Sequence, residues 1–194
     1  MPKQFIGNFI IVIILFLASS TGWCSFSTDI SRIGTSARPM GMGQAFTALA
    51  DEPSAIQLNP AGLAQLRSFR ISSMHTSLLG AIDYLSLDTA IPIFNGTLGL
   101  GAIQGSLPGI PITELDKNNR PVITSEVTYT ESLYLIAYAF PLNNSLDLGI
   151  SGKVFQKDVP SIASAQGYNA DVGLLYRLNK PWRFGLVQKN ALAS

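Results

Sequence analysis

Long stretches of this chain alternate apolar and polar residues with a period of two, and this alternation limits the fold more than any other feature. Over residues 145–156 the even positions are mostly apolar, whereas the odd positions carry serine, aspartate, glycine and lysine. Successive side chains of a β-strand point to opposite faces, so such a run predicts a strand with one apolar and one polar face. The pattern predicts strands over residues 67–77, 83–92, 97–106, 126–140, 145–156, 167–177 and 182–189.

The connections between these strands carry residues that are typical of turns. Asn95-Gly96 and Asn143-Asn144 predict tight turns. Residues 107–125 contain several prolines around a charged centre, and they predict a long exposed loop. Residues 157–166 predict a second loop. The predicted strands are therefore joined as antiparallel hairpins.

Two all-β architectures fit such hairpins: a transmembrane β-barrel with lipid against its apolar face, and a soluble β-sandwich with a dry core. We favour the antiparallel transmembrane barrel because most of the predicted strands are as long as a membrane strand needs, about 9–11 residues or more. Aromatic residues also lie near the strand ends, as in the girdles of outer-membrane barrels. These residues are Phe94, Phe140, Tyr168, Tyr176 and Trp182.

The number of predicted strands is odd. Bacterial single-chain barrels have even strand numbers from eight upward, and seven strands leave two edges without a partner. We therefore expect a partial barrel over residues 67–194. It is either the N-terminal portion of a longer barrel, a fragment, or a wall that closes together with other chains.

The first residues have the three parts of a secretory signal peptide. Lys3 is followed by an apolar run from Phe9 to Ala18 and then by small and polar residues. The run has ten residues, about half of the roughly 20 that a membrane-spanning helix needs, which disfavours a retained anchor. We assign residues 1–24 as a signal peptide and expect the mature protein to be exported.

Residues 25–66 lack the alternation of the later chain and are rich in small residues and proline. Residues 45–50 predict a short helix, and Asp51 is placed to cap the helical turn that follows. Asn59 precedes a proline, and this disfavours helical backbone angles at Asn59. A new short turn is expected to begin after it. We predict a compact segment of short helices and tight turns.

Composition excludes several classes of function. The chain has 13 Lys and Arg against 12 Asp and Glu, a net charge of +1, which leaves no basic excess for nucleic acid. One cysteine and one histidine cannot form a Cys/His metal site. Gly41-Met42-Gly43 lacks the third glycine of a dinucleotide loop, and no G-x-S-x-G elbow occurs. We predict a protein that is not an enzyme and uses neither cofactor nor metal.

The most distinctive motifs lie between residues 34 and 66. A G-M-G-x-A-F block begins at Gly41, an A-L-A-D block ends at Asp51, and an N-P-A-G-L block begins at Asn59. In this order and spacing they resemble the N-terminal signature of the PorV/PorQ family, outer-membrane barrels similar to the FadL fatty-acid transporters. Residues 167–176 and 182–186 resemble two paired strands of the same family.

The resemblance implies a barrel whose N-terminal segment, residues 25–66, lies inside as a plug. It implies a place in the outer membrane and a role in passive transport of hydrophobic compounds or in type IX secretion. The implied partners are outer-membrane lipid, with hydrophobic small molecules or secretion-system proteins. A soluble periplasmic β-sandwich that acts as a binding module is the alternative.

The resemblance also marks the residues that would build the plug. The glycines would allow close backbone approach, and the amide of Asn59 would tie its turn. Arg38 and Asp51 would anchor the plug to polar residues of the lumen such as Lys153 or Asp171. The full set is Arg38, Gly41, Gly43, Asp51, Asn59, Pro60 and Gly62.

Overall fold

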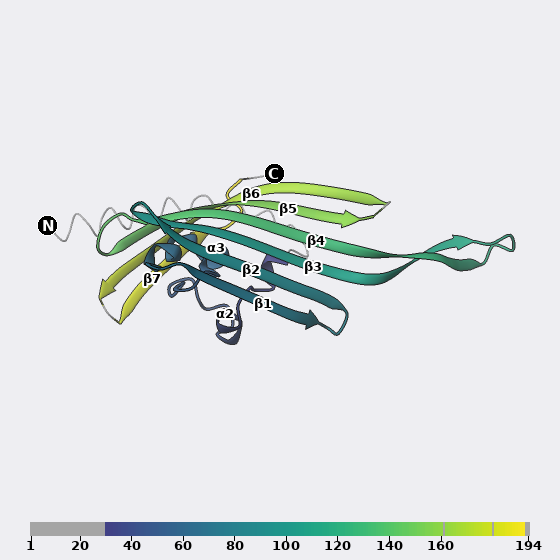
Figure 1. The fold of residues 1–194 in the computed structure, drawn as a ribbon, viewed down its shortest axis with the longest axis horizontal. Coiled ribbons are helices and arrows are strands. Elements are labelled where there is room, and N and C mark those ends of the chain that lie inside the picture. The colour runs from purple at the N-terminus through teal and green to yellow at the C-terminus, as the bar shows by residue number, and fades with distance from the viewer. Residues whose placement is uncertain (1–29, 161, 180, 193–194) are drawn as a thin grey trace.

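A computed structural model describes residues 30–160, 162–179 and 181–192. Seven β-strands follow one another in a single antiparallel sheet (Figure 1). They are β1 (Arg70–Leu78), β2 (Ile82–Ile93), β3 (Gly96–Leu115), β4 (Pro121–Pro141), β5 (Leu146–Val159), β6 (Ala163–Asn179) and β7 (Trp182–Gln188). Four short helical elements precede them: η1 (Ile30–Arg32), α2 (Ala37–Gly41), α3 (Ala55–Leu58) and η2 (Pro60–Gln65). The predicted signal peptide, residues 1–24, lies outside the described residues.

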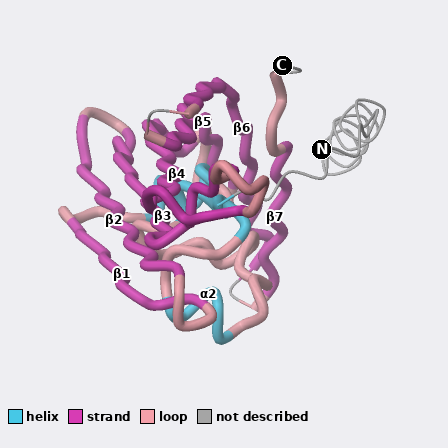
Figure 2. Tube along the Cα trace, turned by 90° about the vertical axis from the view of Figure 1, so that its right-hand side faces the viewer, coloured by secondary structure: helices cyan, strands magenta, loops and turns pink. Residues whose placement is uncertain are grey.

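The sheet curls into a half-barrel with helical turns inside the curl, and α2 lies at its open side between β1 and β7 (Figure 2). The predicted all-β class and the antiparallel order are confirmed, and each predicted strand overlaps an observed one. All described strands belong to this one sheet, whereas a β-sandwich needs two sheets that face each other.

The loop predicted over residues 107–125 is wrong. Strands β3 and β4 continue through it as a two-stranded ribbon that projects beyond the other strands (Figure 1), and only residues 116–120 form the turn. Two irregularities in register, after Leu107 and after Ile112, shift the phase of the alternation and hide it in the sequence. Prolines are tolerated here because each ribbon strand has one edge without a neighbour.

Two smaller predictions are also wrong. Residues 157–166 are mostly strand, because β5 extends to Val159 and β6 begins at Ala163. The helix predicted over residues 45–50 is replaced by hydrogen-bonded turns. Gln44 and Ala50 bracket these turns with positive φ angles of 65° and 38°, which a continuous right-handed helix cannot include.

The hydrophobic core lies inside the curl, between the N-terminal segment and the concave face of the sheet. The segment contributes Phe46, Ile56 and Leu63, which are fully buried. The sheet contributes Tyr84 and Leu133, which are fully buried as well. One sheet and the segment laid across it therefore build the core together.

The two faces of the sheet have an unusual polarity. On β2, Ser86 and Asp88 point into the curl and are fully buried, whereas Leu85 and Leu87 point outward and are 48% and 42% exposed. A soluble sheet places its apolar residues on the buried face. On β2 the small polar residues are covered and the leucines face outward, whereas β4 still turns Leu133 and Leu135 into the core.

Candidate functional site

The N-terminal segment (residues 30–66) fits against the concave face because that face carries glycine where the segment comes closest. Element η2 contacts β4, β5 and β6, and α3 contacts β3 and β4. A Cβ atom added to Gly149 would overlap the backbone of Pro60 and Ala61, and one added to Gly173 would overlap the amide oxygen of Asn59. The small residues on the polar face of β5 and β6 thus make room for the segment.

Asn59 ties the segment to the wall of the half-barrel. Its side chain is fully buried, and its Nδ2 donates to the carbonyl oxygens of Thr47 (2.9 Å) and Leu174 (3.1 Å). Its Oδ1 accepts from the backbone N–H of Ala61 at 3.2 Å and so caps η2, in which Pro60 is the first residue. One amide therefore joins two parts of the segment to β6. The bond to Leu174 connects residues that are 115 positions apart in the sequence.

The side chains of Arg38 and Asp51 pair with each other, and Lys153 pairs with Asp171, so the predicted anchoring is wrong. The pair meets the sheet through the backbone carbonyl of Asp51, which accepts from Arg70 of β1 at 3.5 Å. The guanidinium of Arg38 donates to Asp51 at 2.6 Å and lies 5.2 Å from the ring centroid of Phe46. The hydrogen bond and the charge of Asp51 raise the pKa of Arg38. This partly exposed pair closes the loop between α2 and α3 on itself, and Asp51 does not cap a helix.

The three predicted glycines behave differently from one another. Gly62 approaches the backbone of Ala50 so closely that any side chain would overlap it. Gly43 has a φ of 61°, which the turn after α2 requires. Gly41 has open space around its Cβ position and ordinary backbone geometry, so the structure shows no need for glycine there.

Polar side chains on the concave face donate to carbonyl groups of the segment, and sequence reasoning missed them. Tyr84 donates to Gly34 at 2.8 Å, and Ser86 donates to Thr35 at 2.9 Å. Thr97 donates to the carbonyl of Leu66 at 3.0 Å. The alternation of the sequence could have indicated them, because it places these polar residues on the inward face of their strands. A buried polar side chain needs a hydrogen-bond partner, and the strand itself does not supply one.

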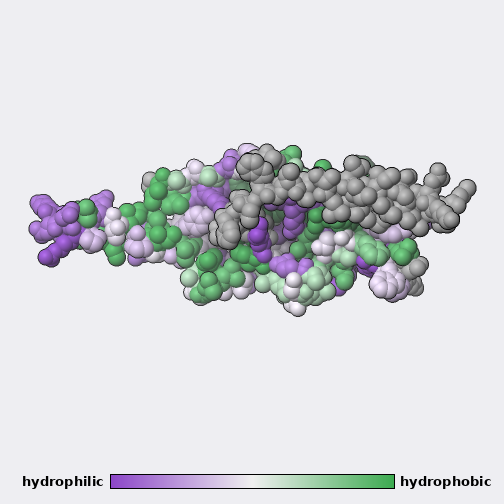
Figure 3. Space-filling model, turned by 180° about the vertical axis from the view of Figure 1, so that it is seen from behind, coloured by the Kyte–Doolittle hydropathy of each residue, from purple (hydrophilic) through white to green (hydrophobic). Residues whose placement is uncertain are grey.

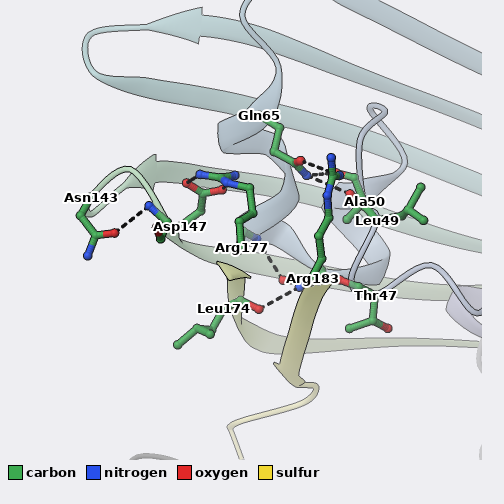
Figure 4. Close-up of polar contacts among 12 residues, drawn as sticks. Thr47, Leu49, Ala50, Gln65, Asn143, Asp147, Leu174, Arg177 and Arg183 are labelled. Atoms are coloured by element: carbon green, nitrogen blue, oxygen red, sulfur yellow. Dashed lines mark hydrogen bonds and ion pairs between the residues drawn. The ribbon is translucent and has the colours of Figure 1, made fainter. Parts of the chain in front are cut away.

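The end of the segment is held to β7. Figure 4 shows Gln65 between the carbonyl groups of Leu49 and Ala50, to which its Nε2 donates, and Arg183 of β7, from which its Oε1 accepts at 3.3 Å. In the same view Arg177 donates to Asp147 at 2.9 Å. The carboxylate of Asp147 is buried, so this pair neutralises a charge inside the curl.

Two further ion pairs lie on the concave face. The ammonium group of Lys153 is 2.7 Å from Asp171, and both side chains are buried. Lys157 lies 3.4 Å from Glu131. Among the described residues, no three His, Cys, Asp or Glu side chains are grouped as a metal site needs.

The convex face is divided by a boundary that follows one register row across β1–β6. Five of the six residues in this row are polar: His75, Leu85, Gln104, Ser132, Gln156 and Gln166. The next outward row, closer to the β3–β4 tip, is entirely polar. It consists of Ser77, Asp83, Ser106, Thr130, Asp158 and Ser164.

Away from the β3–β4 tip the outward residues become apolar, and we call this surface the convex band. Its members are Leu87, Leu98, Leu100, Ile136, Tyr138, Leu148, Ile150, Val172 and Leu174. Ile136 and Ile150 are 57% and 56% exposed. In Figure 3 the projecting tip is hydrophilic, and hydrophobic residues gather along the body of the molecule. Monomeric soluble proteins rarely expose a continuous apolar surface of this kind.

Comparison with known proteins finds no matching family model, curated protein or solved structure. Within the described residues, none of the helices has the length and apolar character that crossing a bilayer would require.

Replacing Asn59 with Ala is expected to destabilise the fold by about 3 kcal/mol, because it removes the three hydrogen bonds of a fully buried side chain. Limited proteolysis of the folded protein should then cut within residues 30–66 at lower protease concentration. Asn144→Ala, in an exposed turn, is the control and should behave as the wild type. Equal resistance of the Asn59→Ala variant would contradict the role of this amide.

Replacing Gly149 with Ala tests the close approach of the segment to the wall. The new methyl group would overlap the backbone of residues 60–61, so we expect a loss of about 1–3 kcal/mol in the free energy of unfolding. Gly167→Ala is a matched control on β6, because its Cβ position has no neighbour within 4 Å. Similar urea midpoints for the two variants would show that the segment does not pack there.

Proposed function

We propose that this chain forms part of the wall of an outer-membrane β-barrel, with its N-terminal segment lying in the lumen as a plug. The observation that carries the proposal is the convex band with its polar boundary. Outer-membrane barrels face lipid with an apolar band, bordered by polar and aromatic residues, and their lumen is polar. The buried ion pairs of the concave face fit a lumen of that kind.

The lengths of the strands support the same proposal. On β5 the outward residues are apolar or glycine from Leu146 to Val154, and Gln156 follows at the boundary. This nine-residue stretch agrees with the roughly 9–11 residues that a tilted strand needs to cross a bilayer. Tyr168, Tyr176 and Trp182 lie at the two margins of the band, where aromatic girdles are expected.

The convex band favours lipid over the soluble alternative. In a periplasmic β-sandwich the outward leucine and isoleucine side chains would meet a second sheet across a dry interface. The described residues contain one sheet, and the convex band lies on its open side. A sandwich would therefore require a second sheet from outside the described residues.

For the biological role we propose, from the resemblance to the PorV/PorQ family, passive transport of hydrophobic compounds or participation in type IX secretion. The two roles differ in what stays bound during purification. Hydrophobic small molecules extracted from the purified protein would favour transport, whereas co-purification with secretion subunits would favour secretion.

A charge placed on the convex band tests the membrane assignment. Ile150→Lys should reduce the stability of the protein folded into lipid vesicles by about 2–4 kcal/mol, the cost of a lysine near the middle of a bilayer. Gln156→Lys, on the same strand face and in the polar boundary row, should cost little. The measurement is urea unfolding in vesicles followed by tryptophan fluorescence.

Fractionation of the producing cells gives an independent check of the same proposal. The wild-type chain should stay with the outer-membrane fraction and need detergent for extraction. Recovery of folded protein in the soluble periplasmic fraction would overturn the membrane assignment, and so would equal tolerance of both lysine variants.

A further inference from the structure

Asp88 differs from the other buried carboxylates of the concave face. Glu131, Asp147 and Asp171 each have a lysine or arginine partner. Asp88 is fully buried, and neither of its carboxylate oxygens has a hydrogen-bond partner or a basic residue within ion-pair distance among the described residues. Burial of a carboxylate without a counter-charge is costly. Since no lysine or arginine side chain in the described part of the chain supplies that charge here, a bound cation would stabilise the carboxylate.

The N-terminal segment brings further oxygen atoms to the same place. The hydroxyl of Thr35 faces the Asp88 carboxylate, is buried, and has no hydrogen bond of good geometry. The carbonyl oxygens of Gly34 and Thr35 accept one hydrogen bond each, from Tyr84 and Ser86, which leaves each a second lone pair. Three unpartnered oxygens and two carbonyl groups thus lie along one contact between the segment and β2.

The nearest other acid does not change this balance. Glu52 adds to the negative potential at Asp88. Its own carboxylate accepts from Ser54 at 2.7 Å and lies 3.8 Å from the guanidinium of Arg38. Glu52 is therefore already compensated, and it brings no counter-charge to Asp88.

We propose that a monovalent metal cation binds between the Asp88 carboxylate and the Thr35 hydroxyl and fastens the beginning of the N-terminal segment to β2. Oxygen ligands of this kind suit hard cations. A single carboxylate matches a single positive charge, whereas a divalent ion would leave a net positive charge in the buried contact. Because the two ligands come from different parts of the chain, the cation binds only the docked segment and so stabilises the folded state.

The test compares urea unfolding of the folded full chain in detergent micelles in sodium, potassium and choline chloride, at one pH and one ionic strength. Choline is too large to enter a buried contact. The midpoint of the wild type should be higher in sodium or potassium chloride than in choline chloride. Asp88→Asn and Thr35→Val should each lose this shift, and Glu114→Gln, which removes an exposed carboxylate from β3, should retain it.

Two results would overturn the proposal. The first is a wild-type midpoint that is the same in all three salts. If that midpoint then changes when the pH is varied, the missing positive charge is a proton and not a metal cation. The second is a cation-dependent shift that survives in Asp88→Asn. If Asp88→Asn does not fold, the test uses the wild type and Thr35→Val. The proposal then requires that the midpoint of the wild type shifts between metal and choline salts and that the midpoint of Thr35→Val does not.

Discussion

The fold depends on how the concave face of the sheet is covered. Many of its inward positions are glycine, small polar or charged residues, and its inward apolar side chains, such as Ile103 and Leu133, need apolar partners across the curl. The N-terminal segment supplies these apolar partners through Phe46, Ile56 and Leu63. It also supplies the backbone carbonyl groups to which Tyr84 and Ser86 donate. Since buried polar groups must be paired, the segment and the sheet fit each other in one arrangement.

The strands were predictable wherever outward apolar and inward polar residues alternate without interruption. Strand β5 is the clearest case, because its alternation runs from Leu146 to Gln156 without a change of phase. The projecting part of β3 and β4 was not predictable, because the chain there inserts extra residues around Gly109, whose φ is 72°. Such an insertion reverses which positions face inward, so a period of two is no longer visible in the sequence.

The candidate site was predictable at single residues and not in its contacts. Asn59 stands out in sequence because an asparagine before a proline commonly caps a turn. Its bond to Leu174 depends on the curl of the sheet, which no local pattern encodes. For Arg38 and Asp51 the sequence predicted a long-range contact with the sheet, whereas the observed contact is the local ion pair between them. Opposite charges 13 residues apart in a compact loop pair with each other before they reach a distant wall.

Closure of the proposed barrel is constrained by the direction of its edge strands. In an antiparallel sheet of seven strands, β1 and β7 run in the same direction. A second copy of this wall, inserted in the same orientation, would place β7 of one copy beside β1 of the other as a parallel pair. An odd number of further strands between β7 and β1 would keep every pair antiparallel, and the total would then be even, as in bacterial barrels. The topology of the described sheet therefore favours closure by an odd number of additional strands over closure by a second copy.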